Sequence, residues 1–437
     1  MNKNTAGRGP IIKEMIITPI AIKDPPLLNA AGLHAPYALR TIVELVTEDG
    51  IVGISEIPGN DAINSSLAEA AKIIIGRDVY QFGKLQQALN AHFGTDTSKD
   101  RGDAPWDQRK LVHVFSALEV ACLDIIGKVV NRPIVDLLGG KMRDAVPFAA
   151  YLFFKYEGAG GELGFGKAPN ASGWDAARQE AAIDPKGIVA QAKAMCKNYG
   201  FQSIKLKGGA FEPELEVDAM FSLHKEFGED MPLRFDPNAI WKPETALKYG
   251  KKMVPILEYL EDPVRGQEEM AKLRKLIKTP LATNMCTTSF DEIPSSIRLG
   301  AEDIILSDHH FWGGLKASME LAKLCSTFDR KLSMHSNSHL GISLAAMVHL
   351  GAALPEVPYA LDTHYPWQSE EVILGGSISF ENGAVEVPKG PGLGVELDRE
   401  ALKVLHQQYL DCGLSKRDDQ IEMRKVQPGW TFQKVRW

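Results

Sequence analysis

From residue 146 onward, short apolar segments alternate with amphipathic segments along most of the 437-residue chain. Parallel strands need a crossover between them, and a helix is the usual crossover, so this alternation favours a parallel β/α barrel. An open doubly wound sheet is the alternative, but the early strands lack the GxGxxG or Walker loop that would support it. We predict eight barrel strands: Pro147–Phe154, Ser203–Lys207, Leu233–Asp236, Tyr259–Glu261, Leu281–Asn284, Asp303–Ser307, Lys331–His335 and Tyr359–Asp362.

The first third of the chain has a different pattern, with strands first and helices afterwards. Ile11–Ile22 and Leu39–Val46 read as strands, and Ser65–His92 and Leu111–Leu138 as helices. Glu48–Asp49–Gly50 after the second strand is a hairpin turn signal. We therefore predict an α+β domain over residues 1–145 and a barrel over 146–394. The tail, 395–437, has an apolar aromatic end that must dock, and we expect it to complete the N-terminal domain.

One barrel connection is longer and richer in glycine than most βα loops. It runs from Lys155 to Ala182 and leaves the end of the first barrel strand, so it should lie over the carboxyl-end mouth of the barrel. A mobile lid and a disordered surface insertion both fit this composition, and the sequence does not decide between them.

Composition excludes several functions. The formal net charge is −7 and basic residues do not cluster, so we expect no nucleic-acid partner. The apolar runs are shorter than the roughly 20 residues that span a bilayer, so we expect no membrane partner. Five scattered cysteines without CxxC pairs, and an N-terminus without a signal-peptide pattern, predict a cytoplasmic protein. An anionic substrate would need locally placed cations.

The segment Ser203–Lys207 continues into two glycines and alternates apolar and basic residues. Lys205 and Lys207 share one strand face, and in a barrel the other, apolar face packs on the helices, so both lysines point inward. Burying one ammonium costs several kcal/mol unless it is compensated. Alone, such a segment is typical of a solvated sheet edge. As the second barrel strand it indicates a base, Lys207, whose pKa is lowered by the charge of Lys205.

Three further strands end in oxygen donors. Asp236, Glu261 and Asn284 are spaced by about one βα unit each, so they should converge at the barrel mouth. Two carboxylates and an amide oxygen suit Mg²⁺, whereas zinc would recruit Cys or His. Any one of them alone is typical of a helix N-cap. Together they predict a metal site.

The sixth and seventh strands end near Asp308 and His335. A carboxylate beside an imidazole fixes its tautomer and raises its basicity, so we predict a second base opposite the lysines. A lone structural histidine is the alternative. His339, four residues further on, we interpret as a substrate contact. A metal flanked by two bases suits removal of the weakly acidic proton α to a carboxylate.

These motifs resemble the enolase superfamily and, within it, the glucarate dehydratase group, over nearly the whole length. The resemblance rests on the KxK strand, Asp-Pro-Asn at Asp236, Glu-Asp-Pro at Glu261, Thr-Asn-Met at Asn284, Asp-x-His-Phe-Trp at Asp308 and His-Ser-Asn-x-His at His335. It implies an α/β fold: a (β/α)8-type barrel, modified to (β/α)7β, with an α+β capping domain built from the N-terminal part and the C-terminal tail.

The resemblance also implies roles for individual residues. Asp236, Glu261 and Asn284 would bind Mg²⁺, Lys207 and His335 with Asp308 would be the bases, Lys205 would lie near the substrate carboxylate, and Asn238 would support the enolate. Contacts to the distal part of the substrate are implied for Asn29, His34, Tyr151, Phe153, His364 and Arg417. The substrate would be a dicarboxylic acid sugar, and we expect a homo-oligomer.

The implied reaction is the dehydration of D-glucarate, and of L-idarate, to 5-keto-4-deoxy-D-glucarate. One departure bears on the substrate: Pro105 stands where the group would have a threonine, and proline donates no hydrogen bond. Alternatives are a dehydratase of another acid sugar such as galactarate, a racemase or epimerase, a weakly active or non-catalytic paralogue, and a Schiff-base aldolase.

Overall fold

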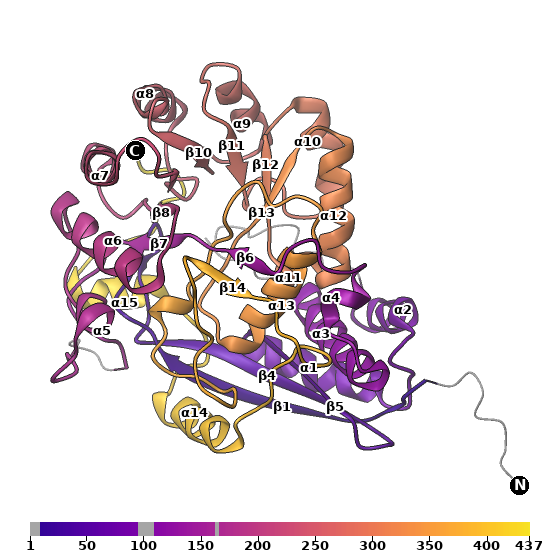
Figure 1. Ribbon diagram of the computed structural model, residues 1–437. Coiled ribbons are helices and arrows are strands. Elements are labelled where there is room, and N and C mark those ends of the chain that lie inside the picture. Colours follow the sequence, from indigo (N-terminus) through magenta and orange to yellow (C-terminus); the bar gives the residue numbers. More distant parts are fainter. Residues whose placement is uncertain (1–8, 95–108, 162–165) are drawn as a thin grey trace, which may run out of the picture.

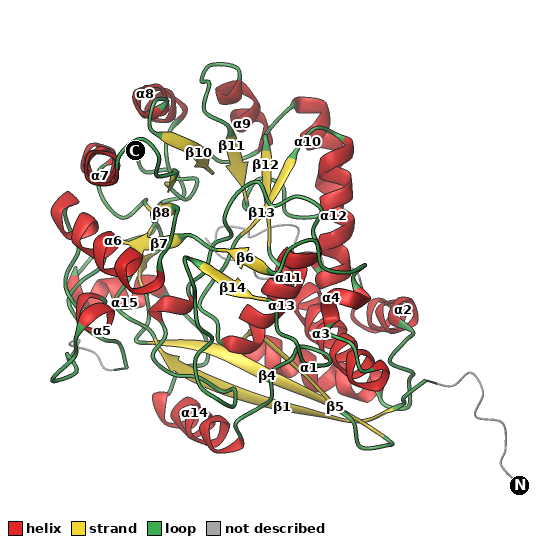
Figure 2. Ribbon diagram, in the orientation of Figure 1, coloured by secondary structure: helices red, strands yellow, loops and turns green. Residues whose placement is uncertain are grey.

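The computed structural model describes residues 9–94, 109–161 and 166–437. Pro105 therefore lies outside the described residues. The N-terminal part forms an antiparallel sheet with helices beside it, and the middle of the chain forms a parallel barrel surrounded by helices, as Figures 1 and 2 show. The predicted fold class, an α/β barrel with a capping domain, is confirmed.

The sheet of the capping domain has three antiparallel strands in the order β1 (Ile12–Lys23), β4 (Tyr37–Thr47) and β5 (Val52–Pro58). The predicted turn joins β4 to β5: Gly50 N donates to Thr47 O at 3.0 Å, with Gly50 at φ +83°. That left-handed conformation favours glycine. Between β1 and β4, a two-strand hairpin inserts toward the barrel, formed by β2 (Leu28–Asn29) and β3 (Gly32–Leu33).

Both long helices predicted for this domain are interrupted. The chain turns at Gly76 between the first two helices, and Asn131, at φ 52°, ends the third one shortly before Pro133. The apolar periodicity of the sequence continues through both breaks. The helix ends are therefore visible only in the backbone conformation, at Gly76 and Asn131. The helices are α1 (Asp61–Ile74), α2 (Phe82–Phe93), α3 (Lys110–Val130) and α4 (Ile134–Leu137).

Seven parallel strands form the barrel wall in chain order: β7 (Ala150–Phe153), β8 (Ile204–Lys207), β9 (Leu233–Asp236), β10 (Leu257–Glu261), β11 (Leu281–Thr283), β12 (Ile304–Ser307) and β13 (Lys331–Met334). The predicted eighth strand appears as a short bridging segment. Asp362 N donates to Met334 O at 3.0 Å and Ala149 N donates to Leu361 O at 2.8 Å, which links β13 to the start of β7. The predicted first strand divides, because Ala145–Pro147 forms β6 and pairs instead with β14 (Ala384–Glu386).

Helices cover the outside of the barrel, and three of them begin with a proline that follows a polar loop. The long ones are α6 (Pro185–Tyr199), α7 (Pro213–Phe227), α8 (Pro243–Met253), α9 (Gln267–Arg274), α10 (Ile293–Leu299), α12 (Leu315–Thr327) and α13 (Gly341–Ala353). The short helices α5 (Gly173–Ala177) and α11 (His309–Trp312) lie in loops at the mouth. Within the described ranges, no helix is long and apolar enough to span a membrane.

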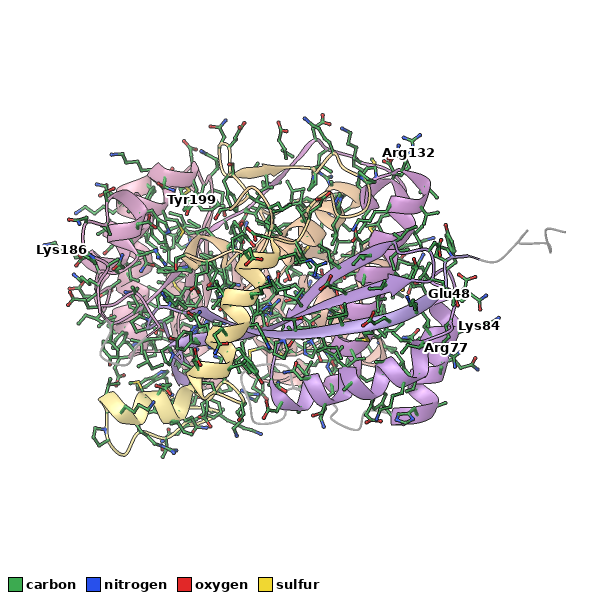
Figure 3. All side chains as sticks on the ribbon, turned by 90° about the horizontal axis from the view of Figure 1, so that it is seen from below. Glu48, Arg77, Lys84, Arg132, Lys186 and Tyr199 are labelled. Atoms are coloured by element: carbon green, nitrogen blue, oxygen red, sulfur yellow. The ribbon has the colours of Figure 1, made fainter. Side chains whose placement is uncertain are left out.

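The C-terminal tail returns to the capping domain. Helix α14 (Arg399–Cys412) packs against β1, and Arg399 forms a bidentate ion pair with Glu44 at 2.7 and 2.6 Å. Figure 3 shows this helix, in yellow, lying across the strands of the three-stranded sheet. Helix α15 (Asp419–Val426) packs beside β3. The docking of the tail puts its polar residues next to the hairpin that faces the barrel.

Helix α3 of the capping domain also forms hydrogen bonds with the barrel. Ser116 Oγ donates to His309 O at 2.8 Å, and Glu119 accepts from the backbone N–H groups of Leu315 and Lys316, both at 3.0 Å. The Glu119 carboxyl thus caps the start of barrel helix α12. Burial raises the pKa of Glu119 to about 7, although these two bonds lower it.

The glycine-rich connection is closed at its base. Lys155 and Ala182 exchange two backbone hydrogen bonds of 3.0 Å. The Lys155 ammonium, fully buried, donates to two backbone carbonyls, and Trp174 Nε1 donates to Pro366 O at 2.6 Å. The described part of this segment is therefore anchored to the barrel. Its interpretations as a lid and as a disordered insertion both stay predictions.

Candidate active site

The two lysines of the KxK segment lie on β8 with their side chains inside the barrel. Lys205 Nζ lies 2.5 Å from Glu261 Oε2, 2.6 Å from Asp362 Oδ2 and 4.6 Å from the centre of the Tyr151 ring. Burial alone would lower the pKa of Lys205, but Asp362 and Glu261 outweigh it and raise the pKa well above its usual range. Lys205 is therefore a fixed cation of the barrel interior.

Lys207 lies nearer to the mouth. Its Nζ atom is 2.6 Å from Asp236 Oδ2, and its side chain is 11% exposed, whereas that of Lys205 is fully buried. Lys205 Nζ lies 3.9 Å from the same Asp236 oxygen, so the two lysines share one carboxylate. The role of Lys207 as a base stays a prediction.

The three predicted metal ligands come together at the ends of β9, β10 and β11. Asn284 Nδ2 donates to Glu261 Oε1 at 2.9 Å, and Asp236 and Glu261 both contact Lys205. The loop after β11 is held by Asp262, which accepts from Asn284 N at 2.9 Å and from the Thr283 hydroxyl. Local geometry thus fixes the direction of Asn284 as well as its position.

Electrostatics at these residues fit a divalent cation. Burial and the adjacent charge of Asp236 raise the pKa of Glu261 well above its usual range. Burial would also raise the pKa of Asp236, but Lys207 and Lys205 hold it below its usual range. The carboxylates of Asp236, Glu261 and Asp362 are buried around the Lys205 ammonium. A hard cation with oxygen ligands would further offset the repulsion between Asp236 and Glu261. Asp236, Glu261 and Asn284 are suited to hold Mg²⁺ there.

Asp362 was missed as a functional residue. It is the last residue of the predicted eighth strand, so the same strand-end argument that selected Asp236 and Glu261 could have selected it. Asn238, predicted to support the enolate, lies beside a predicted metal ligand: its N–H donates to Asp236 Oδ1 at 2.8 Å, and its backbone is left-handed with φ 62°. Asparagine tolerates this conformation better than most residues.

His335 and Asp308 form the predicted pair at the ends of β13 and β12. His335 Nδ1 lies 3.2 Å from Asp308 Oδ2, and Asn337 Nδ2 lies 3.4 Å from the same oxygen. Burial would raise the pKa of Asp308, but His310 and His335 bring it well below its usual range. The carboxylate is therefore ionised, and its contact with Nδ1 orients the imidazole.

His310 was also missed. Its Nδ1 lies 2.7 Å from Asp308 Oδ1, so two imidazoles contact one carboxylate. The signal was present in the Asp-x-His-Phe-Trp motif, where the histidine follows Asp308 by two residues. The prediction used only the aspartate of that motif, Asp308, and left out His310.

Four of the predicted substrate contacts gather on one side of the mouth. The His364 ring lies 4.7 Å from the Tyr151 ring and 5.1 Å from the Phe153 ring, measured between centroids. His34, from the capping domain, lies 5.9 Å from Phe153 and is held by Asp24 at 2.9 Å. Burial, with His34 and His335 next, brings the pKa of His364 well below its usual range, so this ring is neutral.

The other predicted contacts are arranged differently. Arg417 makes a bidentate ion pair with Asp419, both contacts at 2.6 Å, and Asn29 Nδ2 donates to the same carboxylate at 2.8 Å. His339 is buried, and its ring nitrogens contact Leu340 O and Thr363 Oγ1, both at 3.2 Å. Asn29 and Arg417 therefore bind the same carboxylate, that of Asp419. His339 contacts a backbone carbonyl and a buried threonine hydroxyl instead.

A cavity of about 720 Å³ lies between the capping domain and the barrel. Arg40, Lys110, Asn337, Lys416 and Arg417 line it. One of its lining residues, Asn337, follows His335 by two positions in sequence. Lys205, Lys207 and the predicted metal ligands are not among the lining residues. A second cavity, of about 740 Å³ and lined by α2, α3 and α11 residues, contains none of the predicted catalytic groups. The lining of the first cavity has four basic side chains and two carboxylates, those of Asp61 and Asp418.

Comparisons with known proteins agree with this architecture. Residues 187–401 match the family described as enolase C-terminal domain-like, and residues 33–139 match the mandelate racemase / muconate lactonizing enzyme N-terminal domain. The chain belongs to the enolase superfamily. A Streptomyces coelicolor protein named probable glucarate dehydratase is 46% identical over 434 residues, which cover 96% of this chain and 97% of the relative.

Two solved structures are similar over nearly the full length. An enolase from Thermobispora bispora, complexed with magnesium and formate, has a TM-score of 0.90 and 47% identity and covers 98% of this chain and 100% of its own. An enolase from Pseudomonas fluorescens, with bound magnesium, potassium and tartrate, has a TM-score of 0.91 and 43% identity, with the same coverage.

Proposed function

We propose that this protein is a Mg²⁺-dependent dehydratase of acid sugars, acting on D-glucarate and L-idarate to give 5-keto-4-deoxy-D-glucarate. The observation that carries the proposal is that Lys207 lies beside Asp236 and His335 beside Asp308, and that both are near enough to His364 to lower its pKa. The similarity to a probable glucarate dehydratase and to magnesium-containing enolases supports it.

In this proposal each group has a defined task. Asp236, Glu261 and Asn284 hold the metal, which supplies Lewis-acid stabilisation of negative charge on the substrate carboxylate. Lys205, as a fixed cation, faces the same carboxylate, and Asn238 supports the enolate oxygen. Lys207 or His335 removes the proton at C5, α to that carboxylate. The hydroxyl at C4 then leaves, and the resulting enol becomes the 5-keto group.

Two bases account for two substrates. D-glucarate and L-idarate differ in configuration at C5, so a base on each face allows either α-proton to be removed. The departing C4 hydroxyl needs a proton, and we assign that step to His335 for both substrates. His335 reaches this role as the imidazolium formed during proton removal, or from solvent when Lys207 is the base.

The distal carboxylate of a hexarate would bind on the capping-domain side. Arg417, Lys416 and Lys110 line the cavity there, and the whole-chain charge of −7 makes such local cations necessary. Asp419 already pairs with Arg417, so a substrate carboxylate would bind beside that pair and share the guanidinium. Cations at this position support a dicarboxylate over an aldonate.

The test is a substrate panel with Mg²⁺, in which 2-keto acid products are trapped with semicarbazide. We expect product from D-glucarate and L-idarate, and none from aldonates, which lack the second carboxylate. Turnover of galactarate alone would favour the alternative acid-sugar dehydratase. Exchange of the α-proton without keto acid would favour a racemase or epimerase, and activity on monoacids only would contradict the proposal.

A further inference from the structure

His364 stands at the start of a short 3₁₀ turn, η2 (Tyr365–Trp367), directly after the last barrel segment. The Trp367 N–H donates to His364 O at 2.9 Å, so the backbone of the histidine belongs to this turn. The His364 ring contacts the rings of Tyr151 and Phe153 on β7. A displacement of η2 would therefore change the position of the imidazole.

The imidazole of His364 lies close to both candidate bases. Burial lowers the pKa of His364 most, and His34, His335 and Lys207 lower it further. Charge interactions of this kind weaken with distance, so Lys207 and His335 are both near this ring. His364 is thus placed to contact a substrate that both bases can reach.

The described part of the glycine-rich connection holds η2. Trp174 Nε1, on helix α5, donates to Pro366 O at 2.6 Å, and Arg178 Nη1 donates to Trp367 O at 3.0 Å. The last carbonyls of a helix have no partner within it, so these two side chains supply the donors that the turn itself lacks. Trp174 is 3% exposed and Arg178 is 6% exposed, so both bonds are shielded from water.

Aromatic packing joins the same segments. The Trp174 and Trp367 ring centroids are 5.0 Å apart, and those of Trp367 and Phe153 are 5.9 Å apart, both pairs edge-on. Trp367 Nε1 donates to Tyr151 O at 2.8 Å. Edge-to-face contacts fix the direction of a ring as well as its distance. Helix α5, the η2 turn and the end of β7 therefore form one packed unit.

Helix α5 is itself held firmly. Gln179, which follows Arg178, is buried and accepts from Ala168 N at 2.6 Å through its side chain and from Gly158 N at 2.8 Å through its carbonyl. Its side-chain amide donates to Asp175 O, within α5, at 2.6 Å. The segment that carries Trp174 and Arg178 is therefore a rigid support for the turn.

We propose that Trp174 and Arg178 are positioning residues that hold the η2 turn, so that His364 contacts the distal half of the acid sugar and sets the affinity for it. The inference rests on the proposed function, because it takes His364 as a substrate contact. D-glucarate and L-idarate differ at C5 and share the distal half, so this contact acts on both alike. Helix α5 is then a fixed support and not part of a moving lid.

The first test is the steady-state kinetics of Trp174→Phe, which keeps an aromatic ring and removes the N–H that binds Pro366 O. We expect KM to rise roughly tenfold, by the same factor for D-glucarate and L-idarate, while kcat changes by less than about twofold, because the lost contact binds substrate and transition state alike. Arg178→Met should raise KM in the same way, and Arg178→Lys, which keeps a donor, should raise it less.

Trp241→Phe is the matched control. Trp241 is as buried as Trp174, and within the described residues its Nε1 has no hydrogen-bond partner, so KM should not change. A lower unfolding midpoint in Trp174→Phe with an unchanged KM for both hexarates would show a merely structural role and overturn the proposal. A fall in kcat confined to one C5 epimer would also overturn it, because the effect would then reach a base.

The second test needs no turnover. In full-length protein labelled with ¹⁵N-histidine and loaded with Mg²⁺, the His364 ring signals are those lost in His364→Gln. We expect these signals to shift in Trp174→Phe and to keep their positions in Trp241→Phe. His364 signals that stay in place in Trp174→Phe would overturn the inference, whatever the substrate proves to be.

The two tests separate the inference from the proposed function. If the His364 signals shift while no hexarate is dehydrated, the proposed function fails and the positioning of His364 by α5 stands. If hexarates are dehydrated and Trp174→Phe changes neither KM nor the His364 signals, the inference fails and the proposed function stands.

Discussion

The lysine side and the histidine side of the candidate site are built in different ways. On the lysine side, Lys205, Lys207, Asp236 and Glu261 all stand on neighbouring barrel strands and pair with one another directly. On the histidine side, the His335–Asp308 pair is supported from the capping domain. Arg40 Nη1 donates to Asn337 Oδ1 at 3.0 Å, although the two residues are 297 positions apart in sequence.

This difference has a consequence for stability and for catalysis. The lysine side depends on neighbouring barrel strands, whereas the histidine side depends on the docking of two domains. Glu56 accepts from Leu340 N at 2.8 Å and from Ser343 N at 2.9 Å, so the start of α13 is fixed by the capping domain too. Changes at the domain interface should therefore affect His335 before they affect Lys207.

The largest expected effect comes from removing the metal, which acts on the lysine side. Chelation should abolish dehydration, and Mg²⁺ should restore it, because the enolate charge loses its main stabilisation. Mg²⁺ should also stabilise the folded protein, by about 2.7 kcal/mol at a hundredfold excess over Kd. Tm should rise as a result. Calorimetry on Glu261→Gln should show a much smaller shift, with exposed Glu268→Gln as control. An equal shift in both variants would place the cation elsewhere.

Replacing Lys207 or His335 tests the lysine side and the histidine side of the candidate site separately. Lys207→Met should lower kcat by roughly 10²–10⁴-fold for one C5 epimer and much less for the other. His335→Gln should block dehydration of both epimers, since the C4 hydroxyl then lacks its acid, yet exchange of one α-proton should continue through Lys207. Steady-state kinetics and ¹H NMR in D₂O measure the two effects. Equal losses on both epimers in Lys207→Met would contradict the assignment of one base to each face.

Breaking the interface should cost stability and act mainly on the histidine side. Arg40 and Glu56 are both 2% exposed, so Arg40→Met leaves a buried carboxylate without its partner, a loss of about 3–5 kcal/mol. Arg40→Met combined with Glu56→Gln should recover part of it. Urea denaturation of the four proteins of this cycle gives the coupling. Purely additive losses would show that the pair is not a unit.

The smallest effect concerns acid stability. Burial would raise the pKa of Glu56, but Arg40 outweighs it and lowers the pKa below its usual value. An acid whose pKa is depressed on folding stabilises the protein above its unfolded pKa, and that stability is lost as the pH falls through the folded value. Unfolding midpoints from pH 7 to 3 should therefore fall less steeply in Glu56→Gln. Parallel curves for both proteins would exclude this contribution.

Much of the candidate site could be predicted because its residues lie at the carboxyl ends of barrel strands. The alternation of Lys205 and Lys207, and the spacing of Asp236, Glu261 and Asn284, follow from the geometry of parallel strands, and the structure brings these side chains together. Asp362 obeyed the same rule and was overlooked. The class of fold followed from the same periodicity, whereas the predicted eighth strand is only a short bridging segment.

What the sequence could not supply depends on contacts between distant segments. His310 meets the Glu56 carbonyl across 254 positions, and Arg40 reaches Ser343 across 303, and local patterns do not encode such pairs. The breaks at Gly76 and Asn131 were missed for a different reason: apolar periodicity continues across them while the backbone turns. Arg417 was predicted as a substrate contact, but its partner Asp419 also accepts from Asn29, 390 positions away in sequence.

The central claim is that the two bases and the metal ligands together dehydrate a hexarate. The most direct measurement is ¹H NMR of D-glucarate and L-idarate incubated in D₂O with the protein and Mg²⁺. We predict loss of the C5 proton and the appearance of a 4-deoxy-5-keto product carrying one deuterium at C4. A spectrum in which both hexarates keep their C5 proton and form no keto acid, under conditions where Mg²⁺ binding is shown by calorimetry, would contradict the account.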